Sequence, residues 1–201
     1  MSVHSGGVVT TQAQEALPAT FTSAEAPALG LSRRSLLALQ EAGQIERIGR
    51  GIYRRTDAEI ADLDLIEIAI KAPQAILCLT SALARHDLTD LIPATIDLAL
   101  PRGEWQPITS APVTWHKFAQ ETFELGRTTT PIDSAQEIGL YDSPRTICDA
   151  FRLRHLIGED LAYEALRRWL RQHGQPAELI EMAHHFPKAF PAVLHAMQVL
   201  G

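Results

Sequence analysis

The chain has 201 residues, 46% of them hydrophobic and 21% charged, and this balance excludes collagen-like, coiled-coil and wholly disordered proteins. No run approaches the roughly 20 apolar residues that a membrane helix needs, and the first residues lack the basic and apolar regions of a signal peptide. Two cysteines, Cys78 and Cys148, are too few for a disulfide framework or a zinc site. We therefore expect a cytoplasmic protein that does not associate with membranes.

The net charge of -6 is unevenly distributed along the chain. Residues 1–56 contain six arginines and four glutamates, a net charge of +2, whereas residues 57–201 carry the remaining -8. The total charge alone argues against nucleic-acid binding, but its distribution gives a small basic N-terminal region attached to an acidic one.

The N-terminal elements follow a helix, turn, helix and hairpin order. Residues 1–15 are expected to form a flexible tail that overlaps a short helix at Gln12–Leu17. Two further helices are predicted at Ala24–Ala28 and at Arg33–Ala42, with Ser32 as the N-cap and Gly43 past the C-terminal end. The apolar face of the second is expected to contain Leu36, Leu37 and Leu39. A glycine-turned β-hairpin follows around Gly49 and Gly51, so residues 16–57 are predicted to form a winged helix-turn-helix domain that binds DNA.

Residues 58–201 mix helices and strands without a βαβ rhythm, which favours an α+β domain that ends in helices. Short strands are expected at Ala75–Leu79, Thr95–Leu100, Val113–His116 and Phe123–Thr129. Helices are expected at Leu63–Ala72, Ser81–His86, Arg145–Leu156, Glu159–Gln172, Ala177–Ala183 and Pro191–Leu200. The predicted fold class is thus α+β, with an N-terminal winged helix followed by a mixed domain.

Two basic clusters in the N-terminal domain are candidates for DNA contact. The first is Ser32, Arg33, Arg34 and Ser35, at the helix end that faces base edges in a helix-turn-helix. The second lies on the hairpin and contains Arg47, Arg50, Tyr53, Arg54 and Arg55, where guanidinium groups can neutralise phosphates. The alternative for the second cluster is an arginine-rich hairpin that is merely solvated.

A further basic group occurs within the acidic region, at Arg145, Arg152, Arg154, Arg167, Arg168 and Arg171. These residues are either a solvated helix face or a second surface for DNA, RNA or a protein partner. Arg145 has Asp149 four residues on, so the two are also candidates for an ion pair along one helix face.

No residue set in the chain predicts catalysis, a metal site or a cofactor. His184 and His185 are adjacent and point about 100° apart on a helix, so they do not readily share an ion. Cys148 lies beside Asp149, which raises rather than lowers the pKa of a thiol. Phosphate-loop, dinucleotide-binding and hydrolase motifs are absent from the sequence. We expect no enzyme; two alternatives keep the N-terminal DNA-binding domain but give the C-terminal domain a nuclease or a ligand-sensing role.

The sequence resembles AbiE-type antitoxins (AbiEi), the transcriptional regulators of type IV toxin–antitoxin systems. The N-terminal likeness lies in residues 22–34 and 39–55, which include Arg-Gly-Ile-Tyr at 50–53. Residues 76–88 and 141–152 resemble the C-terminal domain of that family, and Ser-Pro-Arg-Thr-Ile-Cys-Asp at 143–149 is the more specific motif.

The resemblance implies an autorepressor that binds inverted repeats of double-stranded DNA in its own promoter, within an abortive-infection system that defends against phage. It also implies a nucleotidyltransferase-like toxin as functional partner, countered without the need for a stable complex. DNA contact is carried over by this resemblance to Ser32, Arg33, Arg34, Arg47 and Arg50.

Overall fold

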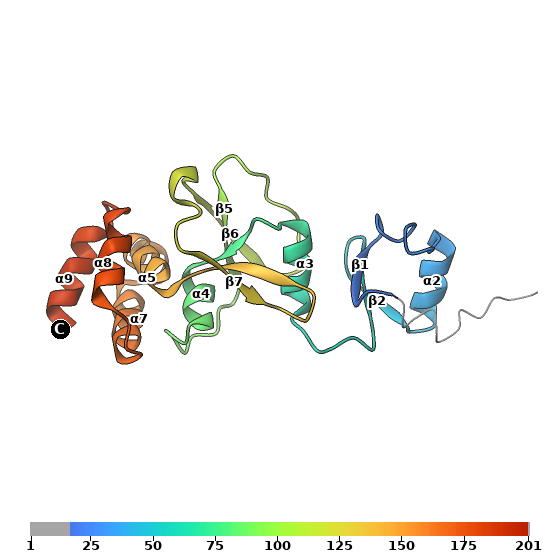
Figure 1. Cartoon of the computed structure of the whole chain (residues 1–201), viewed down its shortest axis with the longest axis horizontal. Helices are drawn as coiled ribbons and strands as arrows, with labels where there is room; N and C mark the ends of the chain where they lie inside the picture. Colours follow the sequence, from blue (N-terminus) through green and yellow to red (C-terminus); the bar gives the residue numbers. More distant parts are fainter. Residues whose placement is uncertain (1–16, 201) are drawn as a thin grey trace, which may run out of the picture. The chain divides into compact units, whose positions relative to one another are not determined.

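The computed structural model describes residues 17–200, and the chain divides into two compact units, residues 1–67 and 68–201 (Figure 1). The division falls within helix α3 (Leu63–Lys71), beyond the domain boundary expected at residue 57. The expected tail at 1–15, and the expected helix Gln12–Leu17 apart from its last residue, lie outside the described residues. The mixed fold class predicted from the sequence is confirmed, with strands and helices in both units.

In the N-terminal unit, a helix packs on one face of an antiparallel three-stranded sheet. The elements are β1 (Thr20–Thr22), α2 (Arg33–Glu41), β2 (Ile45–Gly49) and β3 (Ile52–Arg55), and the strand order is β1-β3-β2. The core between helix and sheet contains Phe21, Ala26, Leu36, Leu39 and Ile45. This unit is the wing-and-helix arrangement that the sequence predicts.

The ends of α2 match the sequence prediction closely. Ser32 is the N-cap, and its hydroxyl accepts a hydrogen bond from the Ser35 N–H at 3.1 Å. Ala42 is the C-cap, and Gly43 follows with a φ of +68°, the left-handed conformation that favours glycine. Side-chain capping and a glycine stop therefore fix this helix locally.

The expected helix at Ala24–Ala28 is a run of turns over residues 23–30 instead. Thr22 and Glu25 form a capping box, in which the Thr22 N–H donates to Glu25 Oε2 at 2.7 Å and the Glu25 N–H donates to Thr22 Oγ1 at 3.3 Å. Pro27 has no N–H to donate, and Gly30 leaves the helical region with a φ of +74°. The segment is too short between these residues for a regular helix.

The C-terminal unit contains a mixed five-stranded sheet. Its strands are β4 (Ile76–Leu77), β5 (Ile96–Pro101), β6 (Val113–Phe118), β7 (Arg127–Pro131) and β8 (Glu137–Tyr141), in the order β6-β5-β4-β8-β7. The pairs β5–β6 and β4–β8 are parallel, and the other two pairs are antiparallel. Strand β8 is absent from the sequence prediction, and the strand expected at Phe123–Thr129 starts only at Arg127, after a 3₁₀ helix, η1 (Gln120–Thr122).

Helices complete the C-terminal unit. They are α4 (Leu79–Arg85), α5 (Ser143–Arg152), α6 (Arg154–Ile157), α7 (Glu159–Arg171), α8 (Pro176–His184) and α9 (Phe190–Leu200). Figure 1 shows that α5, α7, α8 and α9 pack together at one side of the sheet. The single helix expected at Arg145–Leu156 is divided into α5 and α6 at Leu153. Their shared core includes Phe151, Leu166, Trp169, Leu179 and Val193. No helix within residues 17–200 is long and apolar enough to cross a bilayer.

Candidate nucleic-acid interface

The first turn of α2 carries two exposed arginines, Arg33 and Arg34. Neither forms an ion pair with a described residue, and the first turn contains no acidic residue. A helix N-terminus bears a partial positive charge, so cations there are unfavourable to the helix and anions are favourable. The arrangement therefore costs stability locally and leaves a concentrated positive charge open to an anionic partner.

The two serines of the first cluster are engaged with each other. Besides its capping bond, the Ser32 hydroxyl lies 2.9 Å from the Ser35 hydroxyl. Ser32 is exposed and Ser35 half-buried, and each hydroxyl retains a free hydrogen-bonding position. Ser32 thus caps the start of the helix and is also next to Arg33 in the candidate contact surface.

The exposed side of α2 is a continuous stripe that contains Arg33, Arg34, Leu37, Ala38 and Glu41. Leu36 and Leu39 face the core, with 7% and 1% of their surfaces exposed. Leu37, which the sequence analysis grouped with them, is 56% exposed. Adjacent residues on a helix are about 100° apart, so Leu37 cannot share the face of Leu36.

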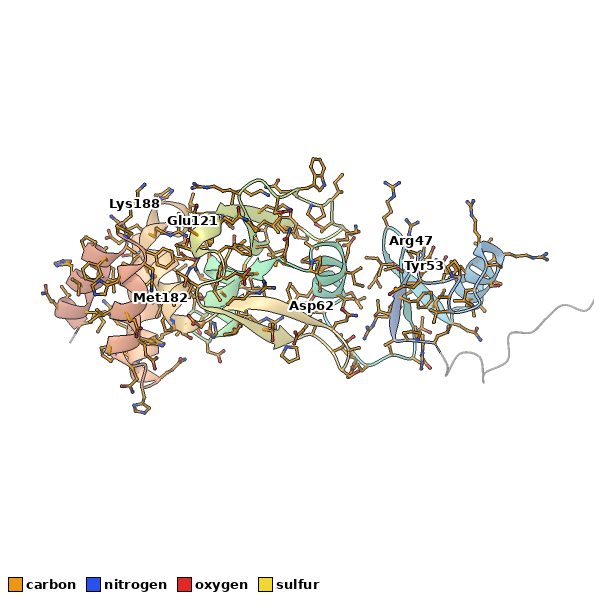
Figure 2. All side chains as sticks on the ribbon, turned by 45° about the horizontal axis from the view of Figure 1, so that its top comes forward. Arg47, Tyr53, Asp62, Glu121, Met182 and Lys188 are labelled. Atoms are coloured by element: carbon orange, nitrogen blue, oxygen red, sulfur yellow. The ribbon has the colours of Figure 1, made fainter. Side chains whose placement is uncertain are left out.

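On the hairpin, Arg47 and Tyr53 lie directly opposite each other in the pairing of β2 with β3. Paired residues project from the same face of a sheet, and Tyr53 also pairs with Phe21, whose ring it stacks on at 5.8 Å between centroids. Phe21 belongs to the core beneath α2, so Arg47 lies on the helix-bearing face of the sheet. Figure 2 shows Arg47 and Tyr53 close together on this hairpin.

The tip of the hairpin presents exposed cations in an ordered turn. The Arg47 Nε donates to the Gly49 carbonyl at 3.0 Å, which holds this side chain along the turn. Arg50 is exposed at the tip, and Gly51 adopts a φ of +74° that other residues rarely reach. Arg47 and Arg50 therefore lie exposed on the hairpin that the sequence predicts to be the wing.

Arg54 does not belong to this exposed set. It is only 2% exposed, and its guanidinium donates to Thr20 Oγ1 and to the Glu59 carbonyl, both at 2.7 Å. Successive residues of a strand project from opposite faces, so Arg54 points away from the face that carries Tyr53. Arg55 returns to that face but binds Asp57 at 2.8 Å and the Leu17 carbonyl at 2.9 Å. We remove Arg54 from the candidate contacts for this reason.

Arg145, expected on a second basic surface, is buried instead. Its side chain is 0% exposed, and its Nε donates to Asp149 Oδ2 at 3.0 Å. Its Nη1 donates to the carbonyls of Thr122 and Leu125, both at 2.6 Å. The guanidinium carbon lies 4.1 Å from the centre of the Tyr141 ring. The expected pair with Asp149 is confirmed, but Arg145 joins α5 to the segment before β7 and offers nothing to a partner.

Most of the other arginines of that group are paired with carboxylates. Arg152 donates to Asp149 Oδ1 at 2.7 Å, and Arg154 lies 3.9 Å from Glu159. Arg168 binds Asp90 and, at 2.6 Å, Glu164.

Only part of the group expected on α7 remains a basic surface. Arg167 and Arg171 are exposed and form no ion pair with the described residues. They line an open hollow of about 380 Å³ together with Leu170 and Leu200. The second basic surface is thereby reduced to these two side chains on α7.

The nucleophile and metal candidates of the C-terminal unit are packed or dispersed. Burial raises the pKa of the Cys148 thiol to about 12, with Asp149 adding to the effect, and it raises the pKa of Cys78 as well. The His184 ring packs on Phe190 at 4.3 Å between centroids. No group of three metal-ligating side chains occurs among residues 17–200. A separate open hollow of about 460 Å³, lined by Asp142, Glu178, Glu181, His185 and apolar residues, is where a ligand-sensing role would be sought.

The fold and the exposed arginines define the class: an α+β protein whose N-terminal unit is a winged-helix domain. Residues 18–56 match a family model described as a transcriptional regulator, AbiEi antitoxin. The resemblance predicted from the sequence is confirmed over this segment, which contains α2 and the hairpin. The match indicates an antitoxin-type transcriptional regulator.

A solved structure extends the comparison over both units. The crystal structure of the RV2827C protein from Mycobacterium tuberculosis superposes with a TM-score of 0.64 at 15% identity, covering 95% of this chain and 75% of that one. At this identity the likeness concerns the fold alone. No curated protein matches the chain.

Proposed function

We propose that this protein is a DNA-binding repressor of its own operon and the antitoxin of a type IV toxin–antitoxin system. The observation that carries the proposal is that Arg33 and Arg34 are exposed, and form no ion pair with the described part of the chain, in the first turn of a helix within the segment that matches the AbiEi family. Such a turn offers positive charge and donors to an anion at the expense of helix stability.

In the proposed complex, α2 enters the major groove by its N-terminal end. Arg33 and Arg34 bind guanine edges or phosphates, because a guanidinium matches guanine O6 and N7 in bidentate fashion. Ser32 and Ser35 donate to phosphates beside the helix terminus. Arg47 and Arg50 bind the adjacent backbone from the wing, and Tyr53 supports Arg47 from within the sheet.

One copy of this surface is too small for tight, specific binding, since specific interfaces bury about 1,000–2,500 Å² of protein surface. We therefore propose that two copies bind an inverted repeat, with half-sites about one helical turn, or about 34 Å, apart or at multiples of that spacing. The repeat would lie in the promoter that precedes the protein's own coding sequence.

The antitoxin part of the proposal assigns a nucleotidyltransferase-like toxin as the partner. Arg167 and Arg171 are the described surface arginines of the C-terminal unit best suited to meet the toxin or the DNA. Reversing both charges to glutamate should weaken either the rescue of growth in cells that express the toxin or the affinity for promoter DNA. If both are unchanged, these arginines are only a solvated surface.

The decisive experiment for DNA binding is a titration of the promoter duplex at salt concentrations between about 50 and 200 mM. Four available arginines predict that the logarithm of affinity falls with the logarithm of salt at a slope no steeper than about -3.6 for one copy and about -7 for two. A duplex of equal length and unrelated sequence serves as control and should bind more weakly. Affinity that is independent of salt, or equal for both duplexes, contradicts the proposal.

A further inference from the structure

Leu37 is a large apolar side chain in the middle of the exposed stripe of α2. It is 56% exposed, while Leu36 and Leu39 on either side of it bury nearly all of their surfaces. The core beneath α2 is closed by Phe21, Leu36, Leu39 and Ile45 without Leu37. Packing within the described residues therefore does not account for a leucine at this position.

On its N-terminal side, the neighbours of Leu37 on the helix surface are the two arginines of the first turn. Residues three and four apart on a helix are adjacent, so Arg33 and Arg34 both flank Leu37. Ala38, also exposed, adds only a methyl group beside it and leaves the helix surface open to close approach. The result is an apolar side chain with the exposed cations of Arg33 and Arg34 on its N-terminal side and the exposed carboxylate of Glu41 one turn further on.

We propose that Leu37 is a specificity-determining residue that packs against the C5-methyl group of a thymine in the major groove. The inference rests on the proposed function, because it requires α2 to enter DNA. In the major groove the thymine methyl is the apolar feature that distinguishes this base from the other three. The exposed Leu37 side chain would find an apolar partner in the thymine methyl group of the major groove.

The helix geometry also predicts where this thymine lies. Three to four residues rise about 4.5–6 Å along the helix, which spans between one and two base-pair steps of about 3.4 Å. The thymine should therefore lie one or two base pairs from the base that Arg33 or Arg34 binds.

Charge complementarity favours DNA over a protein as the occupant of this stripe. A protein partner would have to offer an apolar patch bordered by carboxylates to two arginines that have no acidic neighbour in their own turn. DNA supplies the negative charge along both edges of the groove and the methyl group on its floor.

The test uses a duplex selected by the wild-type protein from a random 20-base-pair library. Each thymine of the selected duplex is then replaced, one at a time, by deoxyuridine, which removes only the C5-methyl group. We expect one replacement in each half-site to weaken binding about fourfold, the equivalent of one buried methyl group. Leu37→Ala should bind the thymine duplex with a comparable loss and should no longer distinguish it from the deoxyuridine duplex.

Two further variants keep the test falsifiable. Leu37→Met retains an apolar contact of similar length and should keep the sensitivity to deoxyuridine, which separates this contact from a folding effect. Ile92→Ala removes an isoleucine that is 94% exposed in the C-terminal unit and should leave binding unchanged.

Sensitivity to deoxyuridine that persists in Leu37→Ala, or its absence from the wild-type protein, overturns the proposal. Weaker self-association of Leu37→Ala in sedimentation, without any effect of deoxyuridine, overturns it in favour of a protein contact. If the selection enriches no duplex, the proposed DNA-binding function itself is wrong. This outcome differs from a failure of the Leu37 proposal, in which a duplex is enriched but deoxyuridine has no effect.

Discussion

The two units of this protein place most of their arginines in different surroundings. In the N-terminal unit, Arg33, Arg34 and Arg50 are exposed and form no ion pair with residues 17–200, and among those residues the Arg47 guanidinium contacts a carbonyl of its own turn. In the C-terminal unit, Arg145 is buried against Asp149, and Arg152 shares the same carboxylate. The number of arginines in a region therefore says little about binding, because neighbouring carboxylates decide whether their charge is available.

The largest expected effect is on stability, at the buried Arg145 of the C-terminal unit. Arg145→Ala leaves the Asp149 carboxylate in the core with fewer partners and leaves the carbonyls of Thr122 and Leu125 without a donor. We expect the free energy of unfolding of the C-terminal unit to fall by about 3–5 kcal/mol, measured by urea denaturation. Arg167→Ala, which removes an exposed arginine, is the matched control and should change it by less than about 0.5 kcal/mol. Equal losses of stability in the two variants would contradict the structural role assigned to the buried Arg145.

The next effect concerns affinity rather than stability. Arg33→Ala and Arg34→Ala should each weaken binding to the promoter duplex by about 1–3 kcal/mol if each arginine binds a base edge. The same changes remove unfavourable charge from a helix N-terminus, so the stability of the N-terminal unit should rise by about 0.3–1 kcal/mol. Titration and thermal unfolding of the same preparations measure both. The prediction is wrong if either variant loses both DNA affinity and stability, because the loss of affinity would then reflect unfolding.

A matched pair on the hairpin sharpens the comparison within one element. Arg47→Ala should reduce the salt slope of DNA binding by about 0.9 for each copy and leave stability nearly unchanged. Arg54→Ala should leave the slope unchanged and cost about 1–3 kcal/mol of stability, because Thr20 and Glu59 lose a buried donor. If Arg54→Ala also reduces the slope, its assignment to the interior of the domain is wrong.

The smallest effect is expected at the exposed pair of Asp90 and Arg168. The hydrogen bond from Arg168 lowers the pKa of Asp90, so the pair stabilises the fold above the ordinary aspartate pKa of about 3.9 and loses this contribution as pH falls through the lowered value. Asp90→Asn should therefore lower the urea midpoint slightly near neutral pH, and the difference should vanish in acid and in high salt. A difference that grows in acid would have the wrong sign.

The sequence predicts α2 and its hairpin well because their signals are local. Ser32 caps the helix, Gly43 ends it, and Gly51 turns the hairpin within a few residues of the strands it connects. Alternation along β3 also separates Arg54 from Tyr53, a signal present in the sequence that the grouping of the hairpin arginines overlooked. In the same way, the helical angle separates Leu37 from Leu36.

The features that the sequence did not predict depend on distant segments. Strand β8 forms because β4, far earlier in the chain, pairs with it in parallel, and Gly139 is needed there because a Cβ atom would lie 2.8 Å from the Ala75 carbonyl oxygen. The burial of Arg145 depends on the carbonyls of Thr122 and Leu125, which precede it by about twenty residues. The pattern of charges along one helix does not predict contacts with segments that are distant in the sequence.

The burial of both cysteines makes the protein convenient to label. Thiol reagents attack the thiolate, and with the pKa of Cys148 raised to about 12 and Cys78 fully buried, neither native side chain presents one near neutral pH. Arg50→Cys would place a single reactive thiol at the tip of the hairpin without removal of the native pair. A DNA-cleaving reagent attached to this thiol would report, base by base, which groove the wing approaches.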